Sequence, residues 1–417
     1  MTAVHPIAHA WISTGGTGAQ NYDEFADDAE ITTILRHAPR SALGVEMPHR
    51  APDSVGDSFA DALPDAVQRL RTAQQEGFYA AEADVVGVYR ISSPDDAATA
   101  SEPAYGVFAM VDTDQISTSA EEPGLVIRNE DVFADKVRER VALLEATEHL
   151  LSAVLLLQTD RGEALRALLA QVCGADGEAD VRDVDPAGRV HEVWAVRDTE
   201  VVAEICALAG GGELVVADGN HRSLAAQTAG LPRFLAVVTT PGSVGLQPYH
   251  RLLSKWPVGL APVPEALRAA GAQVEALAGP AQTPQEPGTI HVHTTDGGYA
   301  VRLPVPEGAS GVDRLDHALV EQVLLRHVLG WDAGDKRVRY IGGDYPASWL
   351  REQVDAGAAA VAVLIAPVRV EDFVAVNLDR ERMPRKSTWF TPKARAGLVL
   401  ADLRSTDARG DASQRVR

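Results

Sequence analysis

Short apolar runs alternate with segments of helical period through the middle of this 417-residue chain. Residues 154–158, 191–196 and 214–217 are apolar runs of strand length. Between them, residues 163–173 and 200–209 repeat apolar side chains at helical spacing. Strands that alternate with helices are typical of α/β architecture. The pattern therefore predicts a mixed α/β fold.

Further elements are expected on either side of this region. Residues 85–89 and 105–111 are interpreted as the two strands of a hairpin, and residues 132–150 as a long helix. Residues 1–80 are expected to hold loops and helices, including a helix over 64–76 with its proline in the first turn. Other strands or helices are expected at residues 125–127, 233–239, 313–329, 348–356 and 360–366.

The length of the chain favours two domains. We expect an N-terminal α/β region over residues 1–256 and a C-terminal α/β domain over residues 257–404. The second region begins with a segment rich in Pro, Gly and Gln, which predicts a small β unit with loops. The polar residues 405–417 are expected to form a disordered tail.

The formal charge of −21 restricts the partners of this chain. An acidic surface repels nucleic acid and anionic membrane surfaces, so neither is an expected partner.

No run approaches the roughly 18 apolar residues of a membrane-spanning helix, and residues 1–20 lack the basic start and apolar core of a secretory signal. Two cysteines, Cys173 and Cys206, do not favour a disulfide scaffold or a zinc cluster. We therefore expect a cytoplasmic protein that binds any anionic ligand in a local basic pocket.

A strand that ends in Asp-Gly and leads into a helix gives the clearest chemical signal. The apolar run 214–217 is followed by Asp218, Gly219, Asn220, His221 and Arg222. A helix start offers free backbone N–H groups and the positive end of the helix dipole, which suits phosphate. Arg222 offers a planar fork for phosphate oxygens, His221 can transfer a proton, and Asp218 can hold Mg²⁺ or act as a base. An Asp-Gly turn with a surface arginine is the other interpretation.

A basic segment stands out near the C-terminus of this acidic chain. Residues 382–393 hold two of the five lysines, together with arginines, hydroxyls and an aromatic pair. Such a cluster is typical of an anion site, with Arg385 and Lys386 as the charges. Ser387 or Thr388 would then donate hydrogen bonds. A solvated basic loop that balances nearby acids is the alternative.

Three other segments are weaker candidates. Glu130 lies between a strand and a long helix, so it is either a catalytic base or an ordinary carboxylate at a helix start. His250 and Arg251 lie in a short segment after a strand, where the histidine fits either core packing or ligand binding. Residues 20–23 either contribute polar groups to a site or form a surface loop, and the surface loop is the preferred interpretation.

Taken together, these motifs resemble the bacterial and archaeal family known as domain of unknown function 1015. Residues 217–222 resemble its Ala-Asp-Gly-His-His-Arg motif, and residues 249–252 its Thr-His-Arg segment. Residues 383–393 resemble its Met-Pro-Gln-Lys-Ser-Thr-Tyr-Phe-x-Pro-Lys signature. The resemblance covers roughly residues 20–400.

The resemblance implies a ParB/sulfiredoxin-like phosphate-binding core with an additional mixed α/β C-terminal domain. It also implies similarity to members that act as free-serine kinases, some of them with pyrophosphate as donor. By position, Asp218, His221 and Arg222 would bind the transferred phosphate and Mg²⁺, and Glu130 would deprotonate the serine hydroxyl. The residues implied in phosphate or substrate binding are Gly219, Asn220, Arg222, His250, Arg251, Arg385, Lys386, Ser387 and Thr388.

The chain departs from the family pattern at three places. Asn220 stands where the family has a histidine, and Asn129 precedes Glu130 where the family has His-Glu. The family's Pro-Pro-Tyr-Asp segment is reduced to Gln-Asn-Tyr-Asp at residues 20–23. Asparagine can hydrogen-bond a phosphate but cannot shuttle protons, so these changes bear on the donor, the acceptor and the activity itself.

Two functions follow as hypotheses. The first is a magnesium-dependent phosphotransferase that acts on a small hydroxyl metabolite, with free L-serine as acceptor and pyrophosphate or a nucleotide as donor. The second is a nucleotide- or phosphate-sensing module without turnover. ParB-like DNA binding is disfavoured by the charge of −21.

Overall fold

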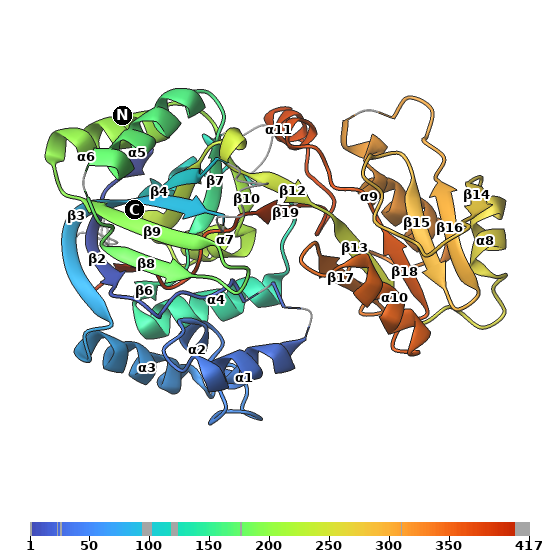
Figure 1. The fold of residues 1–417 in the computed structure, drawn as a ribbon, viewed down its shortest axis with the longest axis horizontal. Helices are drawn as coiled ribbons and strands as arrows, with labels where there is room; N and C mark the ends of the chain where they lie inside the picture. The colour runs from blue at the N-terminus through green and yellow to red at the C-terminus, as the bar shows by residue number, and fades with distance from the viewer. Residues whose placement is uncertain are drawn as a thin grey trace, which may run out of the picture. The chain divides into compact units, whose positions relative to one another are not determined.

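The computed structural model describes residues 2–22, 24–25, 27–93, 102–117, 124–175, 177–309 and 311–404 (Figure 1). Contacts divide the chain into a first unit of residues 1–244 and 392–417, and a second unit of residues 245–391. The expected boundary at residue 256 differs from this division, because residues 249–253 pair with the sheet of the second unit and the chain after residue 391 pairs with the sheet of the first. The tail expected at 405–417 lies outside the described residues.

A mixed sheet forms the centre of the first unit. Within the described residues it has twelve strands, with the main order β5-β10-β7-β11-β4-β3-β2-β20-β6 and with β1, β8 and β9 paired beside this path. The strands are β1 Val4–His5, β2 Ile7–Ser13, β3 Tyr79–Ser92, β4 Ala104–Asp112, β5 Val126–Ile127, β6 His149–Leu150, β7 Val154–Gln158, β8 Val181–Val184, β9 Val190–Val196, β10 Leu214–Asp218, β11 Arg233–Thr239 and β20 Val399–Asp402.

Helices pack against this sheet and connect its strands. The α-helices are α1 Asp28–His37, α2 Leu43–Glu46, α3 Leu63–Gln75, α4 Ala134–Thr147, α5 Gly162–Ala175, α6 Thr199–Ala209 and α7 Asn220–Thr228. Short 3-10 turns are η1 Pro48–Arg50, η2 Thr113–Gln115 and η3 Pro241–Ser243. The largest core cluster of this unit joins the sheet to α5 and α6 through Leu156, Val216 and Phe234 of the strands and Leu165 and Ile205 of the helices.

The strand β10, which leads to the Asp-Gly turn, lies next to the short edge strand β5 of this sheet. It pairs antiparallel with β7 and parallel with β5, so the sheet is mixed rather than purely parallel. Asp218 stands opposite Leu155, after a shift in register beyond Val216. The predicted hairpin is confirmed, because β3 and β4 pair antiparallel with Gly87 opposite Phe108.

The expectation of only loops and helices over residues 1–80 is wrong. Strand β2 pairs with the first half of β3 and with β20. Its buried side chains Ile7, Ala10 and Ile12 do not form a strict alternation, and two of its neighbours in the sheet come from distant parts of the chain. Long-range pairing therefore decides this strand, which its local sequence marks only weakly.

The second unit contains a six-stranded sheet in the order β14-β16-β15-β18-β13-β17 and a separate ribbon of β12 and β19. Its strands are β12 Gly245–Gln247, β13 Tyr249–Leu253, β14 Gln273–Ala276, β15 Ile290–Thr294, β16 Gly297–Arg302, β17 Val338–Gly342, β18 Val361–Leu364 and β19 Trp389–Thr391. Its helices are α8 Val263–Ala269, η4 Gly311–Arg314, α9 Asp316–Leu319, the π-helix η5 Val320–Val328, α10 Ala347–Asp355 and α11 Val370–Leu378.

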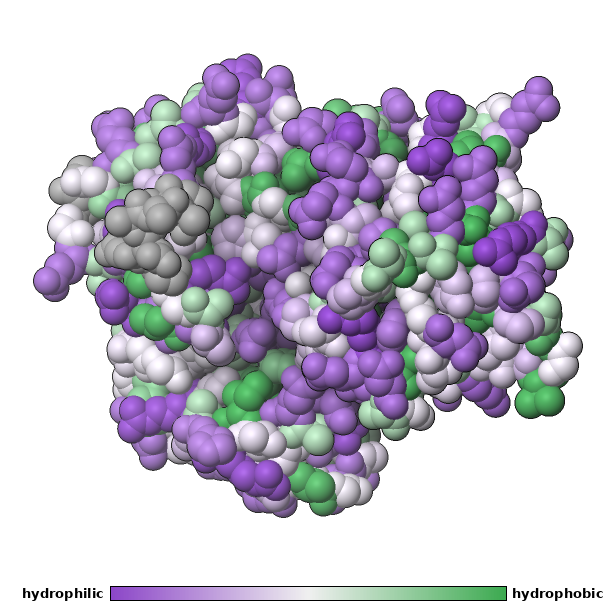
Figure 2. Space-filling model, turned by 45° about the vertical axis from the view of Figure 1, so that its right-hand side comes forward, coloured by the Kyte–Doolittle hydropathy of each residue, from purple (hydrophilic) through white to green (hydrophobic). Residues whose placement is uncertain are grey.

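The mixed α/β fold predicted from the sequence is confirmed. The helix expected over residues 313–329 is instead a succession of 3-10, α and π segments. Among the described residues, no helix combines the length and apolar character needed to cross a membrane. The face drawn in Figure 2 carries mostly hydrophilic residues, with hydrophobic ones in small separate groups.

Candidate functional site

The turn between β10 and α7 brings the first predicted motif to a helix start. Gly219 adopts a φ of +98°, which L side chains rarely adopt. A Cβ atom added there would lie 3.0 Å from the Arg222 guanidinium carbon. Glycine therefore permits both the turn and the return of Arg222 over it, where the guanidinium forms an ion pair with Asp218.

Five side chains meet around this turn, and we call them the Asp218 cluster: Asn21, Glu24, Asp218, Arg222 and Lys393. The Lys393 ammonium lies 3.4 Å from Oδ1 of Asp218 and 3.8 Å from Oε1 of Glu24. Arg222 ion-pairs with Oδ2 of Asp218 and donates to Oδ1 of Asn21 at 3.4 Å. Two cations thus contact one carboxylate, and one of them also contacts a second.

The Asp218 cluster is largely shielded from solvent. The exposed fraction of the side chain is 16% for Asp218, 9% for Arg222 and 11% for Lys393. Charges interact more strongly in such surroundings than in water. Two carboxylates and two cations balance one another, so an incoming anion would have to compete with Asp218 for Arg222 and Lys393.

The two asparagines that depart from the family pattern are in contact. Asn220 Nδ2 donates to Oδ1 of Asn129 at 2.5 Å, and both residues are buried. The Asn220 Oδ1 atom is buried without a hydrogen-bond partner, which is costly for a polar atom. Glu130 follows Asn129 directly and is partly buried. Glu130, the predicted base, therefore directly follows a residue whose side chain contacts the first turn of α7.

His221 contacts the segment that follows Glu130. Its Nε2 accepts a hydrogen bond from the backbone N–H of Phe133 at 3.1 Å, and its ring stacks on Phe133 at an interplanar angle of 9°. A neutral histidine that accepts at Nε2 carries its proton on Nδ1. In this arrangement Nε2 is not available to take a proton from a substrate.

The predicted Mg²⁺ site rests on Asp218 alone among the predicted residues. In the described ranges, no group of three or more His, Cys, Asp or Glu side chains is arranged to hold a metal ion. Mg²⁺ is commonly held by one or two carboxylates together with substrate phosphates and water. Arg222 and Lys393 contact the two oxygens of Asp218, so a Mg²⁺ ion at Asp218 would have to displace one of these cations.

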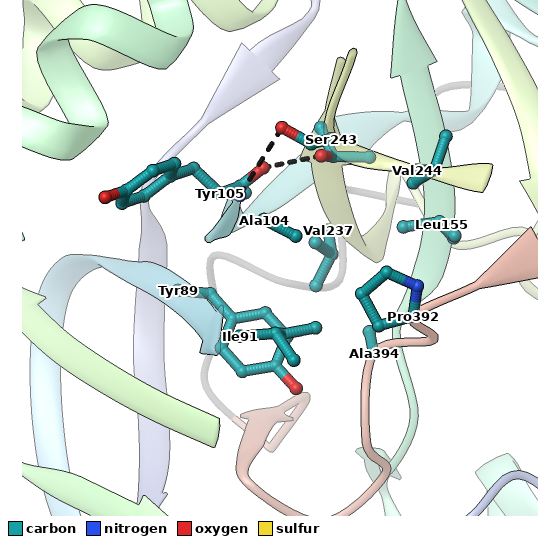
Figure 3. Close-up of a pocket in the computed structure, with 12 residues that line it drawn as sticks. Tyr89, Ile91, Ala104, Tyr105, Leu155, Val237, Ser243, Val244, Pro392 and Ala394 are labelled. Carbon is teal, nitrogen blue, oxygen red and sulfur yellow. Dashed lines mark hydrogen bonds between the residues drawn. The ribbon is translucent and has the colours of Figure 1, made fainter. Parts of the chain in front are cut away.

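A small apolar pocket is lined by residues that neighbour members of the Asp218 cluster (Figure 3). Leu155, the sheet partner of Asp218, lines it, and so do Pro392 and Ala394, the two neighbours of Lys393. Figure 3 shows Tyr89 forming another wall. The pocket therefore adjoins the segment that carries Lys393, although none of the five cluster residues lines it.

A buried polar network holds the segment that carries Lys393. Tyr89 Oη lies 2.5 Å from Nδ1 of His191 and accepts from the backbone N–H of Arg395 at 3.3 Å. His191 Nε2 lies 3.2 Å from Oδ2 of Asp185. Burial acts to raise the pKa of Asp185, but hydrogen bonds from His191 and from Arg189 hold it below its usual value. These bonds fix the backbone two residues after Lys393.

The predicted residues His250 and Arg251 belong to the second unit and are buried there. His250 Nδ1 accepts from the backbone N–H of Ile365 at 3.1 Å, and burial lowers its pKa to about 3, so the ring is neutral at pH 7. Arg251 donates to the carbonyl oxygens of Arg385 and Lys386 at 3.2 and 2.9 Å. Arg251 therefore supports the turn of the second motif.

That turn places the remaining predicted residues. Lys386 has a φ of +51°, which is uncommon for a residue with a side chain. Ser387 is 1% exposed and its Oγ is buried without a hydrogen-bond partner, whereas Thr388 is partly buried. The next residue, Trp389, packs against Gly342 and donates to Asp344. The motif is thus packed into its unit and is not a solvated loop.

Sequence reasoning missed three members of the Asp218 cluster. Residues 20–23 were expected at the surface, but Asn21 is 2% exposed and Tyr22 9%, so that expectation is wrong for both. Asp23 lies outside the described residues. Glu24 carried no signal of its own. Lys393 did carry one, because lysine is scarce in this chain and this one ends the basic segment.

The protein is of the mixed α/β class, and its first unit carries a shielded charge cluster at a strand-turn-helix junction. Residues 17–318 match the family described as "Protein of unknown function (DUF1015)", and the chain belongs to that family. The resemblance noted in the sequence is therefore confirmed. No curated protein matches the chain.

The solved structures that are similar to this chain include the following three. A free serine kinase in complex with AMP is 12% identical with a TM-score of 0.38, and the match covers 68% of this chain and 87% of that one. A conserved hypothetical protein from Pyrococcus furiosus is 12% identical with a TM-score of 0.36, covering 68% and 90%. SbnI with a C-terminal truncation, from Staphylococcus aureus, is 14% identical with a TM-score of 0.38, covering 70% and 85%.

Proposed function

We propose that this chain is a phosphotransferase that moves a phosphoryl group onto the hydroxyl of a small metabolite. The family resemblance implies free L-serine as the acceptor. The observation that carries the proposal is the Asp218 cluster, where Arg222 and Lys393 meet a carboxylate at the start of α7. A ParB/sulfiredoxin-like character of this core, with its strand, Asp-Gly turn and helix, is part of the same proposal.

The reaction needs positioned charge and one proton acceptor. A phosphorus–oxygen bond of the donor breaks, a bond to the acceptor oxygen forms, and the hydroxyl proton passes to a carboxylate. Arg222, Lys393 and the first turn of α7 would stabilise the negative charge of the transferred group. Glu130 remains the proposed base, since the Nε2 atom of His221 already accepts a backbone hydrogen bond.

Mg²⁺ is the proposed cofactor. Asp218 would hold it together with phosphate oxygens of the donor and water. The ion would supply charge neutralisation for the phosphates. Arg222 and Lys393 also contact Asp218, and the one that the ion does not displace would share the negative charge of Asp218 with the ion.

The donor is proposed to be a nucleotide or pyrophosphate. The family resemblance supports either donor. The cytoplasm is the proposed location, and small molecules rather than nucleic acid are the proposed partners.

A phosphoserine assay tests this function. Purified protein with Mg²⁺ and L-serine is offered pyrophosphate, ADP or ATP in separate reactions, and phosphoserine is measured. We expect product from at least one donor and none from Asp218→Asn. Asp135→Asn, a change at an exposed carboxylate on α4, serves as the matched control and should keep full activity. No product from any donor, with protein that melts cooperatively, would refute the proposal.

A sensing module without turnover is the second candidate. The contacts that favour it are the ion pair of Asp218 with Arg222 and the hydrogen bond between Asn129 and Asn220, where the family has histidines. This candidate predicts saturable binding of a nucleotide or pyrophosphate and no product. Calorimetric titration of the same protein with each donor, beside the phosphoserine assay, separates the two functions.

A further inference from the structure

A buried arginine outside the Asp218 cluster forms no ion pair among the described residues. Arg140 on α4 is 6% exposed. Its Nη2 donates to the backbone oxygen of Glu46 at 3.2 Å, and its Nε is buried without a hydrogen-bond partner. The guanidinium also lies 4.2 Å from the ring centre of Tyr22 and 5.1 Å from that of Phe59.

These contacts stabilise the buried positive charge of Arg140 only in part. Aromatic rings attract a cation, but a buried charge normally also has an oppositely charged partner, because its desolvation is costly. Arg138, two residues earlier on the same helix, is exposed and ion-paired with Asp135. The buried arginine of α4 thus lacks the kind of partner that its exposed neighbour has.

Arg140 lines a small cavity in the first unit. Arg222 lines the same cavity, and its guanidinium contacts Asp218, so the cavity reaches the Asp218 cluster. His149 is also part of the wall, but burial lowers its pKa, so it adds no charge at neutral pH. The apolar part of the wall comes from Leu143 and Leu144 of α4 and from neighbouring residues.

The charges around the cavity determine which kind of ligand it can bind. Arg140 favours an anionic ligand, whereas Glu46, another residue that lines the cavity, has a negatively charged side chain that disfavours one. A phosphate with two charges suffers this repulsion more than a carboxylate with one. A ligand that carries an ammonium beside its carboxylate would satisfy both groups.

We infer that Arg140 binds the carboxylate of the acceptor and determines the specificity of the enzyme for acceptors that carry one. This inference rests on the proposed phosphotransferase function for its biological meaning. The acceptor hydroxyl would then point toward Arg222 and the Asp218 cluster, and Glu46 would face the amino group of an amino acid.

Calorimetric titration of the whole chain tests the inference with three probes. L-serine has both groups, 3-hydroxypropionate has only the carboxylate, and ethanolamine has only the amine. We expect the two carboxylates to bind and ethanolamine to bind at least about 10-fold more weakly, the factor typical of losing a hydrogen bond to a charged group. Equal binding of ethanolamine and L-serine, or no binding of either carboxylate, would overturn the inference.

Variants locate the effect at Arg140. We expect Arg140→Met to weaken L-serine binding at least about 10-fold and Arg140→Lys to weaken it less, because lysine keeps the charge. Arg138→Met makes the same charge change on the same helix and should leave binding unchanged. Wild-type affinity in Arg140→Met, with only its melting temperature lowered, would show a purely structural role. If Arg140→Met does not fold, Arg140→Lys and the wild-type probe series decide.

The same titrations separate this inference from the proposed function. Binding of L-serine that depends on Arg140, without phosphoserine from any donor, would leave the carboxylate site in place and refute the phosphotransferase. Phosphorylation of ethanolamine and L-serine with equal KM values would support the phosphotransferase and refute the role of Arg140.

Discussion

Replacing Lys393 with methionine tests whether the Asp218 cluster depends on the ammonium that contacts two carboxylates. At an effective dielectric constant of about 20, charges 3.4 and 3.8 Å apart attract each other by about 4–5 kcal/mol each. Desolvation of the ammonium offsets much of this, and removal of one partner from a buried pair typically costs about 3–5 kcal/mol. Asp218 retains Arg222 and the cluster is partly exposed, so we expect a loss of about 2–3 kcal/mol.

For a unit of this size, that loss corresponds to a melting temperature lower by about 5–10 °C at pH 7. Methionine keeps the length of the side chain, so the loss reports mainly the charge. The double variant Glu24→Gln/Lys393→Met removes one of the two carboxylate charges and should recover at least about 1 kcal/mol. Differential scanning calorimetry of the wild type and both variants gives these values.

The pH dependence of the stability difference between the wild type and Lys393→Met tests this reasoning. In Lys393→Met, the repulsion between Asp218 and Glu24 exists only while both are ionised. Protonation of either carboxylate, which a lower pH favours, relieves it. The difference in stability between wild type and variant should therefore shrink as the pH falls. A difference that stays constant from pH 7 to pH 4.5, or a double variant no more stable than the single one, would refute the reasoning.

Three further predictions concern single residues. Gly219→Ala places a side chain at a φ of +98° and 3.0 Å from the Arg222 guanidinium, so we expect a loss of about 1–3 kcal/mol by thermal unfolding together with loss of donor binding. His250 has its pKa lowered to about 3, below the unfolded value of about 6.5, so its contribution is present above pH 6.5 and is lost as the pH falls. Between pH 6.5 and 5 the wild type should therefore lose about 2 kcal/mol more than His250→Asn in denaturant titrations. Ser387→Ala removes a buried hydroxyl that has no partner, so it should raise the unfolding free energy slightly, by up to about 1 kcal/mol; a clear decrease would show that the hydroxyl forms a stabilising contact.

Local patterns in the sequence predicted most of the elements that surround the site. Strand β7 has the expected bounds, and α7 begins directly after the predicted turn. The pairing of β3 with β4 also followed from two adjacent apolar runs. These elements are determined by side-chain periodicity and by Gly219, whose effects act within a few residues.

The sequence predicted the members of the Asp218 cluster less completely than it predicted these elements. Asp218 and Arg222 are four residues apart on one turn, so their contact follows from local geometry. Lys393 is 175 residues away in the sequence from its partner Asp218. No periodicity predicts such a contact, because it depends on how the segment after residue 391 returns to the sheet of the first unit.

The sequence by itself determined the α/β class, the family and the strand-turn-helix junction at Asp218. These depend on local hydrophobic pattern, on a glycine with positive φ and on motifs of a few residues. The tertiary structure alone decided that Glu24 and Lys393 join Asp218, that Asn129 contacts Asn220 and that Arg140 is buried without an ion pair among the described residues. The physical reason is that charge pairing and burial depend on distances between segments far apart in the chain, and only the packed sheet and its helices fix those distances.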